Sequence, residues 1–273
     1  MVETAVEPGV PHEFELFRRR AYQLTGLDLA CYKAPQMHRR LSVLLTRLRV
    51  ASFTEYTRML ETDAARRQEF RDYVTINVSE FFRDAARFGE LERRILPELL
   101  QRGASLRVWS AGCSNGAEPY SLSILLQELG PERAHSILAT DVDQTILDHA
   151  RSGTGYQAAD LRNVGADRTR RWFVGTPDGK VSVAPAARVG IRFAKHDLLR
   201  DAYPVGPFDL IACRNVVIYF TEDAKERIFD GFVGALRPGG VLFLGGSEAI
   251  MRPQNVGLAV MGPGFYRKVG EGR

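Results

Sequence analysis

The segment from Leu106 to Leu129, LRVWSAGCSNGAEPYSLSILLQEL, limits the fold of this chain more than any other. It has the pattern of a buried strand, then a turn built on Gly112 and Gly116, then a helix that opens at Glu118-Pro119. Strand, glycine turn and helix in this order are typical of the corner where an open α/β sheet binds a nucleotide-like ligand. We therefore expect a ligand to lie against this turn.

The residue types in the turn indicate the charge of that ligand. A pyrophosphate site needs G-x-G-x-x-G with bare amides at the helix N-terminus, whereas this turn has G-x-x-x-G followed by the carboxylate of Glu118. An anion at that helix end disfavours a phosphate and favours a positively charged group. S-adenosylmethionine, which carries a sulfonium and an α-ammonium group, meets this requirement.

An acidic pair follows the next expected strand, His135–Thr140. Asp141 comes roughly 20 residues after the glycine turn, which is where a ribose diol is bound, and a carboxylate can accept both hydroxyl protons. Asp143 has the position of an N-cap for a helix from Gln144 to Arg151. We assign ribose binding to Asp141 and capping to Asp143.

Strands and helices alternate after residue 105, which predicts a parallel, doubly wound sheet. The strands are expected at Leu106–Ser110, Ser136–Thr140, Ile191–Lys195, Phe208–Cys213 and Val241–Gly245. Within Leu258–Lys268 we expect an additional antiparallel strand. Residues 152–190 break the alternation, and the turn Gly175–Gly179 inside them predicts a small β insert.

The first part of the chain has a different pattern. Residues 1–82 have helical periodicity and no convincing strand pattern, so we expect an all-helical N-terminal domain there. We expect a linker helix over residues 83–104 and a second domain over residues 105–273, with its β insert at 152–190. A chain of 273 residues is long enough for two domains.

Composition excludes several classes of protein. The N-terminus is acidic and weakly apolar, and no apolar run approaches transmembrane length, so we expect neither a secretory signal nor membrane insertion. Neither the three separated cysteines nor the five histidines have metal-ligand spacing, which indicates no metal site and a reducing, cytoplasmic location. A net charge of +4 is compatible with acidic partners of any kind.

Residues 29–54 contain no acidic residue but five basic ones, which are Lys33, Arg39, Arg40, Arg47 and Arg49. Arg40 and Arg47 are seven positions apart, so we expect both on the solvent side of a helix that begins near Pro35. Two interpretations stay open, an ordinary solvated face and a docking surface for an acidic partner.

A second informative segment is FDLIACRNVVIYF, from Phe208 to Phe220, in which a strand runs into Asn215 at the ligand-facing end of the sheet. The Asn215 amide can bind an adenine or a methionine group and Tyr219 can line the pocket, although a turn former and a core aromatic fit these residues equally well. Methyltransferases that act on amino groups often have two prolines after this asparagine, and their absence disfavours adenine, cytosine or glutamine as substrate. Asp197, after the strand Ile191–Lys195, is placed to bind the exocyclic amine of adenine.

Three segments together resemble the chemotaxis receptor methyltransferases of the CheR family. They are TINVSEFFRD (75–84), WSAGCSNGAEPYS (109–121), and FDLIACRNVVIYF (208–220) with its continuation LRPGGVLFLGGSE (236–248). The likeness covers about residues 12–268. It implies an all-helical N-terminal domain followed by a Rossmann-like, α/β methyltransferase domain that depends on S-adenosylmethionine and carries a small inserted antiparallel β subdomain.

The same resemblance implies nine cofactor contacts, and the glycine turn adds Gly112 as a tenth. The nine are Asn77, Ser79, Arg83, Glu118, Asp141, Asp197, Leu198, Asn215 and Val216. The chain departs from the family at two positions, since Ile76 stands where a threonine is usual and Ala117 replaces the first of two acids. Both departures leave the ten contacts in place.

The reaction that the resemblance implies is methyl-ester formation on receptor glutamates. A glutamate with a pKa of about 4.3 is ionised at neutral pH, so no general base is needed, which fits the absence of a candidate histidine. Arg83 and Tyr219 are the candidates for holding the substrate carboxylate. The resemblance also gives the basic helix a role, because Arg39, Arg40, Arg47 and Arg49 could dock an acidic helix of a methyl-accepting chemoreceptor.

Some family members grip a receptor tail with the β insert through a longer glycine loop. The loop Gly175–Gly179 is short, so we expect no such tethering here, and we expect a monomer that binds no nucleic acid. Two alternative functions stay open, a nucleic-acid methyltransferase and a regulatory module that binds the cofactor without catalysis. Little interleaving of aromatic and basic residues counts against the first.

Overall fold

The computed structural model describes residues 11–75, 78–103 and 105–270, and its internal contacts divide the chain into two compact units. Unit 1 comprises Met1–Ile76 and Tyr219–Glu226, and unit 2 comprises Asn77–Ile218 and Arg227–Arg273. We expected the first domain to end at residue 82. Phe81 and Phe82 are instead buried in the core of unit 2, because they pack on its helices, so the division falls earlier.

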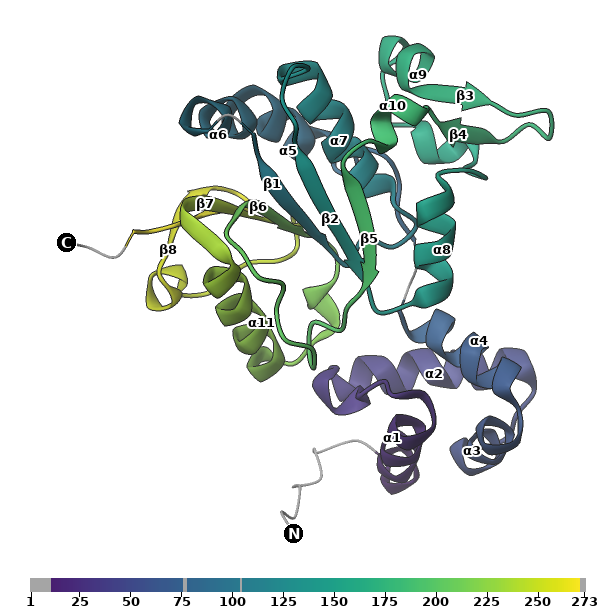
Figure 1. Cartoon of the computed structure of the whole chain (residues 1–273). Helices are drawn as coiled ribbons and strands as arrows, with labels where there is room; N and C mark the ends of the chain where they lie inside the picture. Colours follow the sequence, from purple (N-terminus) through teal and green to yellow (C-terminus); the bar gives the residue numbers. More distant parts are fainter. Residues whose placement is uncertain (1–10, 76–77, 104, 271–273) are drawn as a thin grey trace. The chain divides into compact units, whose positions relative to one another are not determined.

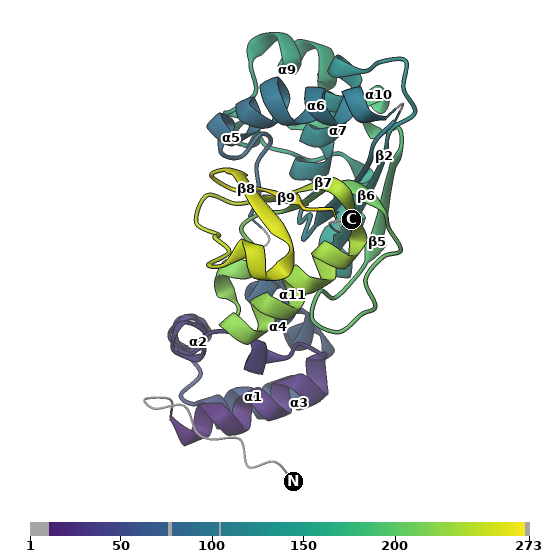
Figure 2. The same ribbon diagram turned by 90° about the vertical axis from the view of Figure 1, so that its left-hand side faces the viewer.

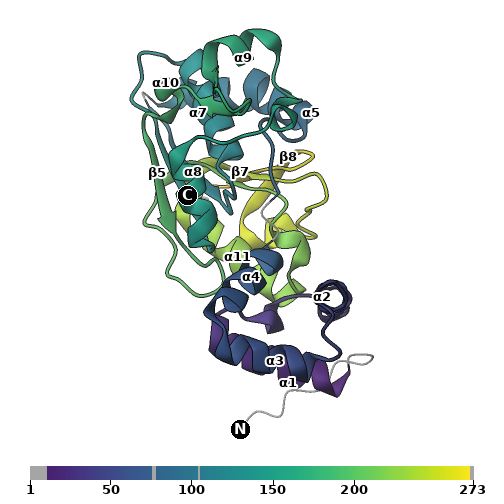
Figure 3. The ribbon, with the colours of Figure 1, turned by 90° about the vertical axis from the view of Figure 1, so that its right-hand side faces the viewer.

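The described N-terminal part of unit 1, residues 11–75, contains four helices, α1 (His12–Thr25), α2 (Ala34–Leu48), α3 (Phe53–Thr62) and α4 (Ala64–Thr75), with a short 3-10 turn, η1 (Leu29–Cys31). α1 and α3 lie side by side (Figure 3). Their apolar positions recur at helical spacing, so Phe14, Phe17 and Phe53 meet in one aromatic core. Ser52 caps α3 by accepting the Glu55 N–H.

Unit 2 is built around a seven-stranded sheet with the order β5-β2-β1-β6-β7-β9-β8 (Figure 1). The strands are β1 (Arg107–Ala111), β2 (Ser136–Asp141), β5 (Ile191–Lys195), β6 (Phe208–Cys213), β7 (Leu236–Leu244), β8 (Leu258–Gly262) and β9 (Phe265–Lys268). The first five of that order are parallel, and β9 and β8 form an antiparallel hairpin, with β5 and β8 at opposite edges (Figure 2). The predicted parallel sheet and its terminal hairpin are confirmed. The chain reverses its direction of growth between β1 and β6, and such a switch point forms a crevice at the carboxyl ends of the strands.

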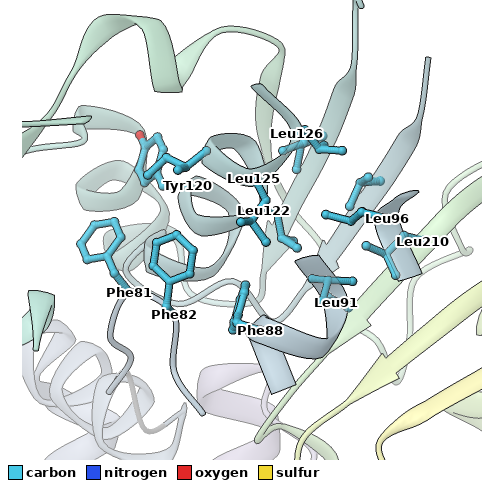
Figure 4. Packing of buried hydrophobic residues seen from close by; sticks show 14 of the residues in the cluster. Phe81, Phe82, Phe88, Leu91, Leu96, Tyr120, Leu122, Leu125, Leu126 and Leu210 are labelled. Carbon is cyan, nitrogen blue, oxygen red and sulfur yellow. The ribbon is translucent and has the colours of Figure 1, made fainter. Parts of the chain in front are cut away.

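One face of the sheet carries most of the helices. They are α5 (Ala85–Glu90), the π-helical turn η2 (Leu91–Ile95), α6 (Leu96–Arg102), α7 (Ala117–Leu129) and α8 (Gln144–Ser152). Leu122, Leu125 and Leu126 of α7 pack between Phe81, Phe82 and Phe88 on one side and the sheet on the other (Figure 4). On the opposite face, Phe232 of α11 (Glu222–Ala235) packs edge-on against Trp109 of β1. The predicted linker helix, residues 83–104, corresponds to α5, η2 and α6, which belong to the core of unit 2.

The predicted β insert is present between β2 and β5. It contains η3 (Ala158–Leu161), α9 (Ala166–Trp172), the hairpin β3 (Phe173–Gly175) and β4 (Val181–Val183), and α10 (Pro185–Arg188). The hairpin projects away from the main sheet (Figure 1). Arg168 and Trp172 of α9 both donate to Glu128 of α7, so the insert is anchored to the helical layer. Among the helices of the described residues, none has the length and apolar character needed to cross a bilayer.

Candidate cofactor site

The turn between β1 and α7 uses three residues with positive φ, Gly112 (80°), Ser114 (49°) and Gly116 (89°). The backbone N–H of Gly112 donates to Thr140 O at 2.8 Å, which joins the turn to the end of β2. A Cβ at Gly112 would lie 2.5 Å from Val216 Cγ2, so the position needs glycine for space as well as for conformation. The helix begins at Ala117, one residue before the predicted opening.

Glu118, at the first turn of α7, is buried at the carboxyl end of β1. Its Oε1 accepts the Ser110 hydroxyl at 2.7 Å, and its Oε2 lies 3.7 Å from Arg214 Nη1. Burial raises the pKa of Glu118, and the Arg214 charge and the Ser110 hydrogen bond oppose that rise. A buried carboxylate at the N-terminus of a helix is suited to receive a cationic group of a ligand, such as an ammonium group.

Arg214 was not among the predicted site residues. It is buried where β6 ends, it donates to Arg83 O at 2.7 Å, and it lies 3.9 Å from Asp84 Oδ2. Its guanidinium stacks over Phe88 and Phe243 at 5.1 and 4.6 Å. Burial lowers the pKa of Arg214, and the neighbouring carboxylates of Glu118 and Asp84 oppose that effect. An arginine directly after the wholly apolar end of a strand was the signal in the sequence that could have identified it.

Asp141 ends β2 and faces the glycine turn. Its Oδ2 accepts the Ser114 N–H at 2.8 Å and its Oδ1 accepts the Asp143 N–H at 3.1 Å. Burial raises the pKa of Asp141 to about 6, although these hydrogen bonds oppose the rise. Asp143 caps α8, as predicted, by accepting the N–H groups of Thr145 and Ile146. The Asp141 carboxylate lies beside the glycine turn instead.

The segment before α5 also reaches the turn. The Asn115 amide donates to Ser79 O at 3.2 Å, and its oxygen accepts the Ala117 N–H. Arg83 Nη1 donates to Val78 O at 3.1 Å. The structure thus brings Ser79 to the glycine turn, while Asn77 lies outside the described residues.

Two further predicted contacts follow β5. The Asp197 carboxylate accepts the Leu199 N–H at 2.9 Å, and Leu198 O accepts the Tyr203 hydroxyl at 3.0 Å. β5 pairs with β2, and the His196 N–H donates to Asp141 O, so Asp197 lies at the same edge of the sheet as Asp141. The loop after β6 completes this edge with Asn215 and Val216, where Asn215 has a φ of 60°.

Tyr219 belongs to unit 1 by its contacts. It ends the 3-10 turn η4 (Val217–Tyr219), and its carbonyl accepts the Lys33 N–H at 3.0 Å. Among the residues that the structure describes, no cluster of three histidine, cysteine or acidic side chains could hold a metal ion.

The structure corrects the expectation that Arg40 lies on the solvent side of its helix. Its guanidinium donates to the carbonyls of Val74 and Tyr73, at the end of α4, and stacks on the Tyr73 ring at 4.8 Å. The last carbonyls of a helix have no partner within it, and Arg40 supplies one. Arg47 is exposed as expected and lies 3.7 Å from Glu69.

Arg39 and Arg49 are exposed as well. Arg49 follows α2 as its C-cap with a φ of 57°.

A switch point with one buried carboxylate at a helix N-terminus and another at the next strand end fits the cationic and diol groups of S-adenosylmethionine. The fold and the site therefore define the class of methyltransferases that depend on this cofactor. A family model described as "CheR methyltransferase, SAM binding domain" matches residues 77–261, and one described as "CheR methyltransferase, all-alpha domain" matches residues 12–75. The chain belongs to the CheR methyltransferase family.

Individual proteins agree with this assignment. A "Chemotaxis protein methyltransferase" of Listeria monocytogenes is 43% identical over 263 residues, which cover 96% of this chain and 99% of that protein. "Chemotaxis protein methyltransferase 1" of Pseudomonas aeruginosa is 36% identical, covering 93% and 97%. The chain also resembles a solved TehB-like SAM-dependent methyltransferase from Corynebacterium glutamicum at 20% identity and a TM-score of 0.38, over 68% of this chain and 94% of that one. The predicted family, enzyme class and cofactor are confirmed, and nothing supports the nucleic-acid or non-catalytic alternatives.

Proposed function

We propose that this enzyme methylates glutamate side chains on the cytoplasmic helices of chemoreceptors, and that it does so in the cytoplasm as a monomer. The observation that carries the proposal is the buried Glu118 carboxylate at the N-terminus of α7, beside a turn in which Gly112 has no space for a Cβ. The family assignment supplies the reaction class.

The residues around the turn suit each part of the cofactor. We assign the ammonium group to Glu118 and the ribose hydroxyls to Asp141, because these two buried carboxylates have acceptor capacity next to the turn. Asp197, Leu198, Asn215 and Val216 are assigned to the nucleoside, and Asn77, Ser79 and Arg83 complete the set on the strength of the family's motif. When it is bound, S-adenosylmethionine supplies an electrophilic methyl group on a sulfonium.

The protein's task toward the substrate is orientation. A glutamate carboxylate is already ionised at neutral pH, so the protein need not remove a proton. Arg83 and Tyr219 are proposed to orient that carboxylate, since a tight ion pair would make the oxygen a weaker nucleophile. Excluding water favours a reaction in which opposite charges merge.

We propose that the N-terminal domain docks the receptor through Arg39 and Arg47 of α2 and Arg49, its C-cap, which are all exposed. Arg40 is removed from this set, because its guanidinium is committed to the carbonyls at the end of α4. The loop Gly175–Gly179 spans only the tight turn between β3 and β4, which supports the proposal that the insert does not hold a receptor tail.

Methyl-labelled cofactor and a receptor-rich membrane fraction test the proposal. After mild alkali, label released as volatile methanol is the expected result, because carboxyl methyl esters hydrolyse under these conditions. Alkali-stable label would mean methylation on nitrogen or carbon and would contradict the proposal, and so would the absence of label. Excess S-adenosylhomocysteine should abolish the signal and serves as the control.

A further inference from the structure

Glu248 is a buried carboxylate that lies at the centre of a cluster of backbone donors. It is 5% exposed and follows β7. Its Oε2 accepts the N–H groups of Asn215 and Gly245, both at 2.7 Å, and its Oε1 accepts those of Val216 and Val217, both at 2.9 Å. One side chain thus satisfies four backbone donors, and three of them are consecutive.

The loop after β6 needs such an acceptor. Asn215 has a φ of 60°, so the chain leaves the strand in a left-handed conformation and the next N–H groups cannot continue a sheet ladder. Successive N–H groups that converge on one point form a concavity that binds anions, and here the protein's own carboxylate fills it. Without that carboxylate, buried donors would be left unsatisfied, which is costly.

The same loop carries side chains into the cofactor site. Arg214 begins it and lies 3.7 Å from Glu118, while Val216 packs so closely on Gly112 that no Cβ fits between them. A change in the loop backbone would therefore move Arg214 and Val216, the two side chains by which this loop reaches the cofactor site. Its effect would reach the cofactor although Glu248 lies behind the loop.

We propose that Glu248 is a positioning residue: it holds the loop Arg214–Val217 in the conformation that receives the cofactor, without touching cofactor or substrate. The inference rests on the proposed function in one respect, the assignment of Asn215 and Val216 to the nucleoside. It concerns affinity for the cofactor rather than recognition of the receptor, which gives it a distinct kinetic signature.

The chain contains a matched control at the other end of β6. Asp209 is also 5% exposed and also accepts a backbone N–H, that of Arg107, at 2.6 Å, and it pairs with Arg237 at 2.7 Å. Glu248→Gln and Asp209→Asn remove one buried carboxylate each and preserve side-chain size. Only the first affects the loop at the carboxyl end of the strand.

Calorimetry with S-adenosylhomocysteine tests the proposal on the full chain. In Glu248→Gln the amide nitrogen faces N–H donors, so we expect the Kd to rise roughly tenfold and the KM for receptor to stay unchanged. In Asp209→Asn we expect a Kd within about twofold of wild type at a similar loss of thermal stability. The backbone amide proton resonances of residues 215–217 should move upfield in Glu248→Gln alone.

Two calorimetric results would overturn the inference. One is a Kd in Glu248→Gln within about twofold of wild type, and the other is an equal loss of affinity in Asp209→Asn. The wild-type protein provides a measurement that needs no variant to fold: amide exchange at residues 215–217 should be slow before cofactor is added, and fast exchange contradicts the proposal. Asn215→Gly keeps the positive φ of the loop but removes the side chain that is assigned to the nucleoside. Unchanged affinity in this variant would refute that assignment, whereas the Glu248→Gln measurements test the role of Glu248.

Discussion

Arg214 Nη1 lies 3.7 Å from Glu118 Oε2, so the cation at the end of β6 faces the carboxylate that opens the helix after β1. β1 and β6 are neighbours in the sheet, and the two charges meet at the point where its order reverses. The arginine offsets part of the cost of burying the Glu118 anion, because the attraction opposes the rise in the pKa of that carboxyl. A cationic ligand therefore meets a carboxylate whose charged form the neighbouring arginine favours.

Glu118→Gln should weaken cofactor binding more than it weakens folding. Ser110 can still donate to the amide oxygen, but the charge for the ammonium group is lost and Arg214 loses one of its neighbouring carboxylates. We expect the Kd for S-adenosylhomocysteine to rise about 10- to 100-fold, measured by calorimetry. Glu128→Gln, on the same helix and facing the insert, is the control and should leave the Kd unchanged. Equal effects of the two substitutions would contradict the assignment.

Cofactor affinity should fall at low pH through Asp141. The pKa of this carboxyl in the cofactor-free protein is raised to about 6, and only the ionised form accepts from both ribose hydroxyls. Affinity is therefore complete above that pH and decreases as the pH falls through it, by roughly tenfold for each unit below. Calorimetry from pH 5 to 8 measures the slope. Asp141→Asn should bind weakly with a smaller slope, and an unchanged slope would show that another group titrates.

The sequence was sufficient for the architecture of each unit, because periodicity and strand ends are local signals. The positions of Glu118 and Asp141 at the carboxyl edge followed from the strands before them, and both side chains are at that edge. Arg214 and Glu248 were missed because their partners are far away in sequence. Glu248 acts on a loop 33 positions before it, and no local pattern reports that distance.

Arg40 illustrates the same limit in unit 1. Its spacing from Arg47 correctly placed both on one side of α2, yet periodicity could not reveal that the open carbonyl end of α4 lies within reach of one guanidinium. Burial patterns identify a face of a helix, and only the tertiary structure identifies what covers it. The unsatisfied carbonyls of Tyr73 and Val74 then determined which arginine became structural.

Gly112→Ala tests whether the turn and the loop after β6 must fit closely. The substitution introduces a strained positive φ and a Cβ at 2.5 Å from Val216 Cγ2, so we expect lower thermal stability and weaker cofactor binding. Gly179→Ala is the matched control, since its φ of 76° gives similar strain but no atom lies within 4 Å of the new Cβ. Adding Val216→Ala should restore part of the stability lost in Gly112→Ala. No recovery would contradict the steric explanation.

Arg40→Ala should destabilise the N-terminal domain without affecting cofactor affinity. The change removes two hydrogen bonds to the carbonyls of Val74 and Tyr73 and the stacking on the Tyr73 ring, a loss of about 1–3 kcal/mol. Urea unfolding of the full chain, followed by circular dichroism, measures the loss. Arg39→Ala, one residue earlier and exposed, should change stability by less than about 0.5 kcal/mol. If the two variants were equally stable, Arg40 would have no structural role.

Charge reversal on the exposed side of α2 should raise the KM for receptor. Arg39→Glu with Arg47→Glu replaces two cations by anions, so an acidic receptor helix would be repelled and the KM should rise about tenfold at low ionic strength. The effect should shrink as salt screens the charges, while the Kd for S-adenosylhomocysteine stays constant. Arg58→Glu, an exposed position on α3, carries the same kind of change outside α2 and should leave the KM unaltered. Arg47→Glu also removes the ion pair with Glu69 at 3.7 Å, which could alter folding. The single Arg39→Glu variant and a circular dichroism spectrum of the double variant therefore show whether a raised KM comes from weaker docking or from altered folding. An unchanged KM at low salt in the double variant would mean that the receptor is recognised elsewhere.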